Sequence, residues 1–125
     1  MKRKKTLNIG DFVMRDNNYP MQKALAAAKG IVISRNYYMD IDSMVKTPVS
    51  REEALSYGQK LQMNLPTKRQ LDLITKNMEK INQSLHTIGR GDYMLFYDMQ
   101  QDFWTVSDDK KNEKERRRVV FIAPL

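Results

Sequence analysis

Residues 67–89, TKRQLDLITKNMEKINQSLHTIG, carry the strongest periodic signal in the chain. Thr67 and Gln70 form a capping box, because the Thr67 hydroxyl can accept from the Gln70 amide while the Gln70 side chain reaches back. Asn77 interrupts good helix formers, so we predict either one long helix or two consecutive short ones that end at Gly89. A helix stripe is usually core, and we expect burial here in preference to partner binding. The stripe has spacings of three and four and consists of Leu71, Ile74, Met78, Ile81, Leu85 and Ile88.

A second capping box, at Ser50 and Glu53, predicts another helix that runs to about Gln62. Gly58 lies inside this helix, where it either lowers the stability or allows close packing. The residues that we expect this helix to bury are Ala54, Leu55 and Leu61.

Short β-branched and aromatic runs predict strands at residues 7–14, 31–33, 39–45, 93–97, 103–106 and 118–123. Pro20 to Ala28 predicts a short helix closed by Gly30. The last strand is apolar on both faces, as expected in the centre of a sheet, and the polar residues 107–117 predict a long hairpin loop. These elements predict an α+β fold in which a mixed or antiparallel sheet is flanked by two main helices.

Composition and charge limit the class of protein. The 125 residues fit one domain, which we place at 8–125 after a basic tail at 1–7. The net charge is +7, of which residues 2–5 contribute +4 and residues 107–118 contribute +2, so the body is close to neutral. The chain has no cysteine, which excludes disulfides, thiolate metal sites and thiol nucleophiles.

No apolar run reaches the roughly 18 residues that a membrane helix needs. Polar residues follow the basic tail where a secretory signal would be apolar. We therefore expect a cytoplasmic protein, with a virion or a cell-surface assembly as the other settings.

Three local strings and the order of elements resemble the small C-type-lectin-fold domains of bacterial and viral proteins, which are related to formylglycine-generating-enzyme-like domains. The strings are Gly10-Asp11-Phe12 with Lys29-Gly30-Ile31-Val32-Ile33 downstream, Leu65-Pro66-Thr67 followed by Leu71, and Ile81-Asn82-Gln83-Ser84-Leu85 leading to Phe103-Trp104-Thr105-Val106. The resemblance covers residues 8–123. It implies a looped, mixed sheet with two helices, whose variable loops bind protein or glycan ligands.

The chain departs from that family at the residues that carry its activities. Catalytic relatives depend on cysteines, and this chain has none. Calcium-dependent lectins use a proline-containing triplet and a Trp-Asn-Asp strand, whereas Trp104 here is followed by Thr105-Val106. A helix at residues 21–28 also replaces the usual loop. The resemblance therefore implies a binding scaffold without the oxidase activity or the calcium site.

Few residues offer catalytic or metal chemistry. His86 is the only histidine and has no second soft ligand nearby, so we expect an exposed, neutral side chain. Asp40 and Asp42 would share one face of a strand and present oxygens to a hard cation, but a solvated edge is the better interpretation, since no EF-hand spacing accompanies them. We expect no enzymatic activity, no metal and no cofactor.

Two functions remain open after these exclusions. The first is a non-enzymatic binding or assembly domain for a protein or glycan, which uses the connections between Gly89 and Arg118. Its candidate contact residues are Tyr97, Phe103, Trp104, Lys110, Lys111, Arg116 and Arg117. The alternative is a basic nucleic-acid-binding protein with stacking surfaces at Tyr37-Tyr38 and Phe103-Trp104. Its candidate phosphate contacts are Lys2, Arg3, Lys4, Lys5, Arg116, Arg117 and Arg118. The oligomeric state is left open.

Overall fold

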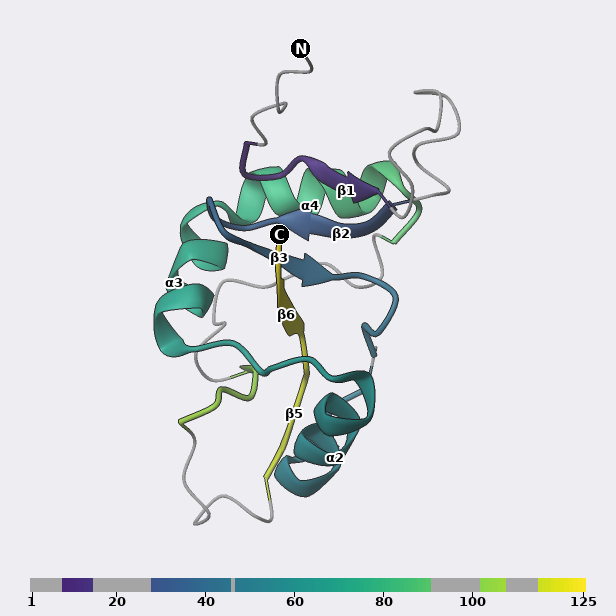
Figure 1. Ribbon diagram of the computed structural model, residues 1–125, viewed down its shortest axis with the longest axis vertical. Helices are drawn as coiled ribbons and strands as arrows, with labels where there is room; N and C mark the ends of the chain where they lie inside the picture. The colour runs from purple at the N-terminus through teal and green to yellow at the C-terminus, as the bar shows by residue number, and fades with distance from the viewer. Residues whose placement is uncertain (1–7, 15–27, 46, 91–101, 108–114) are drawn as a thin grey trace.

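Four strands form an antiparallel sheet in the order β1-β2-β3-β6, and β4 and β5 form a second, two-stranded sheet (Figure 1). The computed structural model describes residues 8–14, 28–45, 47–90, 102–107 and 115–125. This architecture confirms an α+β fold in one domain. The elements are β1 (Phe12–Met14), β2 (Ala28–Val32), β3 (Tyr37–Asp40), β4 (Val49–Ser50), α2 (Arg51–Leu61), α3 (Lys68–Lys76), α4 (Met78–Thr87), β5 (Arg116–Arg117) and β6 (Phe121–Pro124).

The periodic stretch forms two consecutive helices that meet at Asn77. The Asn77 side chain donates to the carbonyl of Leu73 at 2.9 Å, and it makes no cap hydrogen bond at the start of α4. The stripe is core, as predicted: Leu71, Ile74, Ile81 and Leu85 are fully buried, while Met78 and Ile88 pack against them partly buried. Both hydrogen bonds of the α3 capping box are present: the Thr67 amide donates to the Gln70 side chain, and the Gln70 amide donates to the Thr67 hydroxyl. They confirm the predicted helix start.

Two hydrophobic cores lie on opposite sides of the C-terminal segment. The helix–sheet core contains the buried stripe of α3 and α4 together with Ile31, Ile33, Met39, Phe103, Val120 and Ile122. The α2 core contains Ala54, Leu65, Trp104, Val119 and Phe121. Successive residues from 119 to 122 alternate between the two cores, which is the period of an extended chain.

This alternation corrects one sequence-based prediction. The last strand was expected in the centre of the sheet because it is apolar on both faces, but β6 lies at the end of the order of described strands. It is apolar on both faces because a separate core covers each face. On its other side, β6 forms an isolated bridge between Ile122 and Asn64. Its backbone therefore makes hydrogen bonds on the side that faces away from β3 as well.

Gly30 lies inside β2 and does not close a helix, contrary to the prediction. A Cβ at this position would overlap the ring of Tyr38 and would lie 2.9 Å from the carbonyl oxygen of Met39. Ala28, predicted as the end of the helix, is the first residue of β2, and the rest of that predicted helix falls outside the described residues. The strand predicted at 39–45 is β3, which begins earlier and ends at Asp40.

Other predicted elements of the C-terminal third also change. The strand predicted at 103–106 is reduced to a bridge from Phe103 to Arg118, and the strand predicted at 93–97 lies outside the described residues. The predicted hairpin loop at 107–117 is wrong at its end, because Arg116 and Arg117 form β5 and pair with β4. Residues 108–114 of that loop are not described.

The helix α2 packs on β6 through Gly58. A Cβ at Gly58 would lie 2.8 Å from the edge of the Phe121 ring and 3.0 Å from the carbonyl oxygen of Met63, so of the two predicted roles the structure supports close packing. Ala54 is buried and Leu61 is half-buried, but Leu55 was wrongly expected in the core and is 41% exposed. Within the described parts of the chain, no helix is long and apolar enough to span a membrane.

Replacing Gly58 with alanine tests this packing. Alanine improves the helix propensity by about 1 kcal/mol, but overpacking a filled core costs about 1 to 3 kcal/mol. We expect Gly58→Ala to lower the free energy of unfolding by about 1 kcal/mol, measured by urea titration. Ser56→Ala, on the exposed side of the same helix, should change it by less than about 0.5 kcal/mol. A Gly58→Ala protein that is more stable than the parent by the full gain in helix propensity would contradict the close contact.

Candidate functional site

The aromatic pair predicted as a contact surface is buried. Phe103 is 1% exposed and belongs to the helix–sheet core, whereas Trp104 is fully buried in the α2 core. The prediction that either ring contacts a partner or stacks on a base is therefore wrong. Of the second pair, Tyr38 is buried and Tyr37 is 40% exposed. Tyr97, Lys110, Lys111 and the tail residues Lys2, Arg3, Lys4 and Lys5 lie outside the described residues.

The three arginines do not form one basic patch. Arg116 pairs with Glu53, with 3.5 Å between Nη1 and Oε1. The Arg117 guanidinium donates to the Glu115 carboxylate and lies 4.8 Å from the centre of the Trp104 ring. Arg118 lies 4.8 Å from the centre of the Phe103 ring, and burial lowers the pKa of its guanidinium. Each arginine therefore has its own partner within the protein.

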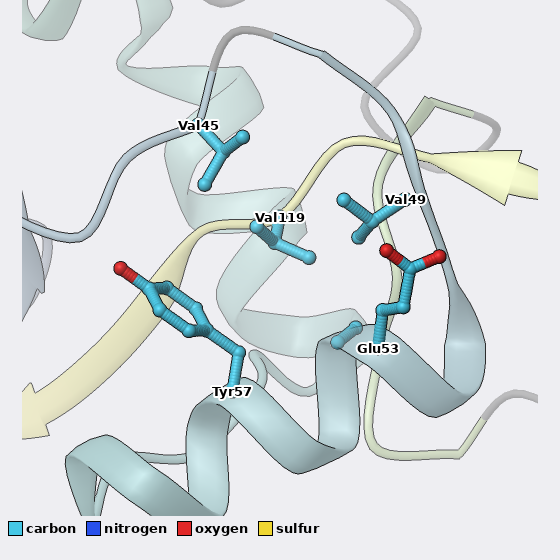
Figure 2. A pocket seen from close by; sticks show the side chains of 6 residues that line it. Val45, Val49, Glu53, Tyr57 and Val119 are labelled. Atoms are coloured by element: carbon cyan, nitrogen blue, oxygen red, sulfur yellow. The ribbon is translucent and has the colours of Figure 1, made fainter.

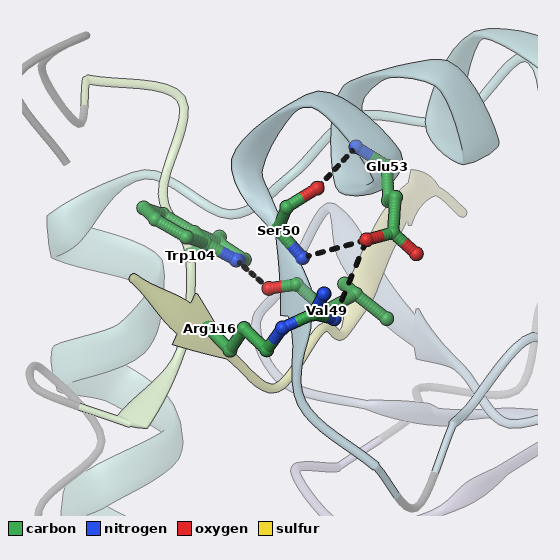
Figure 3. A network of polar contacts seen from close by, with 5 residues as sticks. All are labelled: Val49, Ser50, Glu53, Trp104 and Arg116. Carbon is green, nitrogen blue, oxygen red and sulfur yellow. Dashed lines mark hydrogen bonds and ion pairs between the residues drawn. The ribbon is translucent and has the colours of Figure 1, made fainter. Parts of the chain in front are cut away.

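The start of α2 is tied to β5 by a network of polar contacts (Figure 3). The indole nitrogen of Trp104 donates to the carbonyl of Val49 at 2.8 Å. Ser50 is both the last residue of β4 and the N-cap of α2, and its capping box with Glu53 is complete, as predicted. Backbone pairing of β4 with β5 places Ser50 opposite Arg116, which brings the Arg116 side chain to the Glu53 carboxylate.

A pocket of about 170 Å³ opens between α2, β4 and the chain leading into β6. Figure 2 shows the side chains of Glu53 and Tyr57 rising from α2 toward three valines. The pocket is lined by Val45, Val49, Glu53, Ala54, Tyr57 and Val119. It adjoins a more open depression along α2, which shares Glu53 and Tyr57 and is completed by Glu52, Ser56 and Lys60. The pocket therefore has apolar walls, one carboxylate and one phenol.

The Glu53 carboxylate is held in its charged form. The Ser50 side chain, the Ser50 amide and, more weakly, the charge of Arg116 lower the pKa of the Glu53 carboxyl below its ordinary value of 4.5. Hydrogen bonding to a charged form favours that form. At neutral pH the pocket therefore presents a negative charge.

The other candidate residues for ion binding or catalysis do not converge. Asp40 is buried and accepts from the amide and the hydroxyl of Ser43, at 2.9 and 2.6 Å, so it stabilises the turn after β3. Asp42 and His86 are exposed. Among the residues that the structure describes, no three His, Cys, Asp or Glu side chains are grouped so that they could hold a metal ion.

No pattern in the sequence indicates the pocket. Its walls come from Val45 before β4, from Val49 in β4, from α2 and from Val119, and only the capping box was visible as a local signal. Comparisons with protein-family models, curated proteins and solved structures found no match for the chain.

Replacing Trp104 with phenylalanine tests the link between the two segments. Phenylalanine keeps an aromatic ring but leaves the Val49 carbonyl without its indole donor, which costs about 1 to 3 kcal/mol. We expect faster hydrogen exchange at the amides of Ser50 and Glu53, together with lower global stability. Phe103→Leu, which removes volume from the other core, should lower the global stability without this selective effect. Equal protection of both amides in Trp104→Phe and the parent would show that the indole does not hold β4.

The depressed pKa of the Glu53 carboxyl predicts a pH dependence of stability. A carboxyl with a lower pKa in the folded state stabilises the fold above its ordinary pKa of 4.5, and loses this contribution as the pH falls through the folded value. Glu53→Gln keeps a capping-box side chain but cannot ionise. We expect the stability advantage of the parent over Glu53→Gln to be full at pH 6 to 7 and to shrink below about pH 4.5. A pH-independent difference in the free energy of unfolding would contradict the assignment.

Proposed function

We propose that the chain is a non-enzymatic protein-binding domain that receives a segment of its partner in the pocket between α2 and β4. The observation that carries the proposal is an apolar pocket, bordered by exposed tyrosine and glutamate side chains, on one side of a helix. Concave apolar sites with a few polar groups are the usual form of a binding site. The proposal agrees with the binding role expected from the sequence, but it assigns the contact surface to α2 and β4 in place of residues 89–118.

The chemistry of the pocket supports binding in preference to catalysis. A general base works best when its pKa lies near the working pH, whereas the pKa of the Glu53 carboxyl is lowered. The carboxylate also already accepts from the Ser50 amide and pairs with Arg116. Glu53 is thus suited to holding a positive charge, and poorly suited to taking a proton.

The charge of the site favours a protein over a nucleic acid. Glu52 and Glu53 lie in the first turn of α2 and repel phosphate groups. Of the rings proposed to stack on bases, Tyr38, Phe103 and Trp104 are buried and Tyr37 stays exposed. Arg116 and Arg117 contact carboxylates, which weakens the nucleic-acid alternative further. The resemblance to C-type-lectin-fold domains stays a prediction, and the binding proposal does not depend on it.

A matched pair of helix variants tests this proposal. Tyr57 and Leu55 are similarly exposed, at 36% and 41%, but Tyr57 lines the pocket and Leu55 lines neither depression. Peptides selected from a random library on the full chain should bind Tyr57→Ser at least about tenfold more weakly, the effect of losing one contact worth about 1.4 kcal/mol. They should bind Leu55→Ser with unchanged affinity.

Binding is measured by fluorescence anisotropy with labelled peptides, after circular dichroism has shown that both variants are folded. Two outcomes overturn the proposal: a library that yields no peptide with specific binding, or peptides that bind Tyr57→Ser as well as the parent. Binding of labelled DNA or RNA that depends on salt but not on Tyr57 would favour the nucleic-acid alternative instead.

A further inference from the structure

We infer that the pocket takes a lysine or arginine side chain of the partner, with the alkyl stem between the valines and the cation on the Glu53 carboxylate. The inference rests on the proposed function, since it names the partner chemistry for the same pocket. Three observations lead to it: the apolar walls, the charge at the mouth, and the weak ion pair that now uses that charge.

The walls of the pocket match an alkyl stem. Val45, Val49 and Val119 present methyl groups, and Ala54 adds another from α2. Lysine and arginine bury their methylene groups along apolar surfaces while the charged head reaches a polar partner. A purely aliphatic side chain would fill the same space but would leave the nearby carboxylate unused.

The mouth of the pocket supplies the partner for the cation. The hydrogen bond from the Ser50 amide and the ion pair with Arg116 both go to Oε1 of the Glu53 carboxylate. Figure 3 shows the second carboxylate oxygen directed away from both groups. This oxygen can accept from a ligand without disturbing the capping box, and Glu52 in the same helical turn adds negative charge.

Tyr57 provides a second group that attracts a cation. Its ring packs at 5.4 Å and a tilt of 56° against the ring of Phe121, which fixes its orientation beside the pocket. The face of an aromatic ring attracts ammonium and guanidinium groups. The Tyr57 ring and the Glu53 carboxylate lie at opposite ends of the pocket, with Val119 between them (Figure 2).

Arg116 occupies the carboxylate in the absence of a partner. The side chains of this ion pair are 66% and 56% exposed, with 3.5 Å between the paired atoms. Solvent-exposed pairs contribute only about 0 to 1 kcal/mol. A partner's cation on the second oxygen would repel the Arg116 guanidinium, which can leave the carboxylate at low cost, so Arg116 competes with the ligand for the charge of Glu53.

Small amides of single amino acids test the inference on the full chain. The probes are the N-acetyl N-methylamides of lysine, arginine and norleucine, where norleucine has an alkyl chain without the charge. Binding is followed by the amide shifts of Ala54, Tyr57 and Val119 in ¹H–¹⁵N spectra. We expect the lysine or the arginine probe to bind at least about fivefold more tightly than the norleucine probe, since a charge-assisted hydrogen bond adds about 1 kcal/mol or more.

Three charge variants separate the roles of the residues. Glu53→Gln keeps the capping box and should reduce the affinity for the cationic probes to that for norleucine. Arg116→Gln removes the competitor and should raise the affinity by about two- to fivefold, as expected for an exposed pair. Glu79→Gln, which removes a glutamate from the first turn of α4, should change nothing.

The outcomes distinguish this inference from the proposed function. If norleucine binds as tightly as both cationic probes, or if Glu53→Gln has no effect, the inference is wrong, while peptides that depend on Tyr57 would still support a binding domain. If neither the probes nor the selected peptides shift the pocket amides, both are wrong. Weaker binding by Arg116→Gln would overturn the competing role of Arg116.

Discussion

The fold depends on the placement of one extended segment between two separate cores. From Val119 to Ile122, successive side chains enter the α2 core and the helix–sheet core in turn. Phe103 and Trp104 likewise enter different cores, Phe103 the helix–sheet core and Trp104 the α2 core. A bridge from Phe103 to Arg118 holds this pair beside the extended segment. Because each core lacks part of its apolar surface without these residues, the two halves of the protein share one central element. The position of α2, and with it the pocket, follows from this arrangement, since Gly58 and Phe121 are in direct contact.

The local signals in the sequence predicted most of the helical structure. Both capping boxes formed at the expected residues, because they need only side chains three positions apart. The break between α3 and α4 at Asn77 is also local, because the Asn77 side chain bonds to the Leu73 carbonyl four residues earlier. The signals that failed concern contacts between distant parts of the chain. Gly30 resembled a helix stop, but its role is to make room for the Tyr38 ring of the neighbouring strand. The apolar run at the C-terminal end resembled a central strand, because the sequence does not reveal that there are two cores.

The binding pocket could not be predicted from the sequence for a related reason. Val45, Val49 and Val119 are ordinary apolar residues, and Glu53 reads as part of a helix cap. Only the pairing of β4 with β5, and the contact of α2 with β6, places these side chains around one space. Conversely, the residues that looked most suited to binding were an aromatic pair and a run of arginines. Both rings are buried, and two of the arginine side chains lie against those rings.

Ser50 ends a strand and begins a helix, and this double position has a thermodynamic consequence. The amide and the hydroxyl of Ser50 orient Glu53, while its backbone pairs with Arg116, which is distant in the sequence. A compound that binds Glu53 only when this junction is ordered would shift the opening equilibrium of the junction toward the state in which β4 and β5 are paired, even though it displaces the Arg116 side chain. Binding at a small surface site would in this way stabilise the pairing of β4 with β5, which joins the middle of the chain to its C-terminal segment.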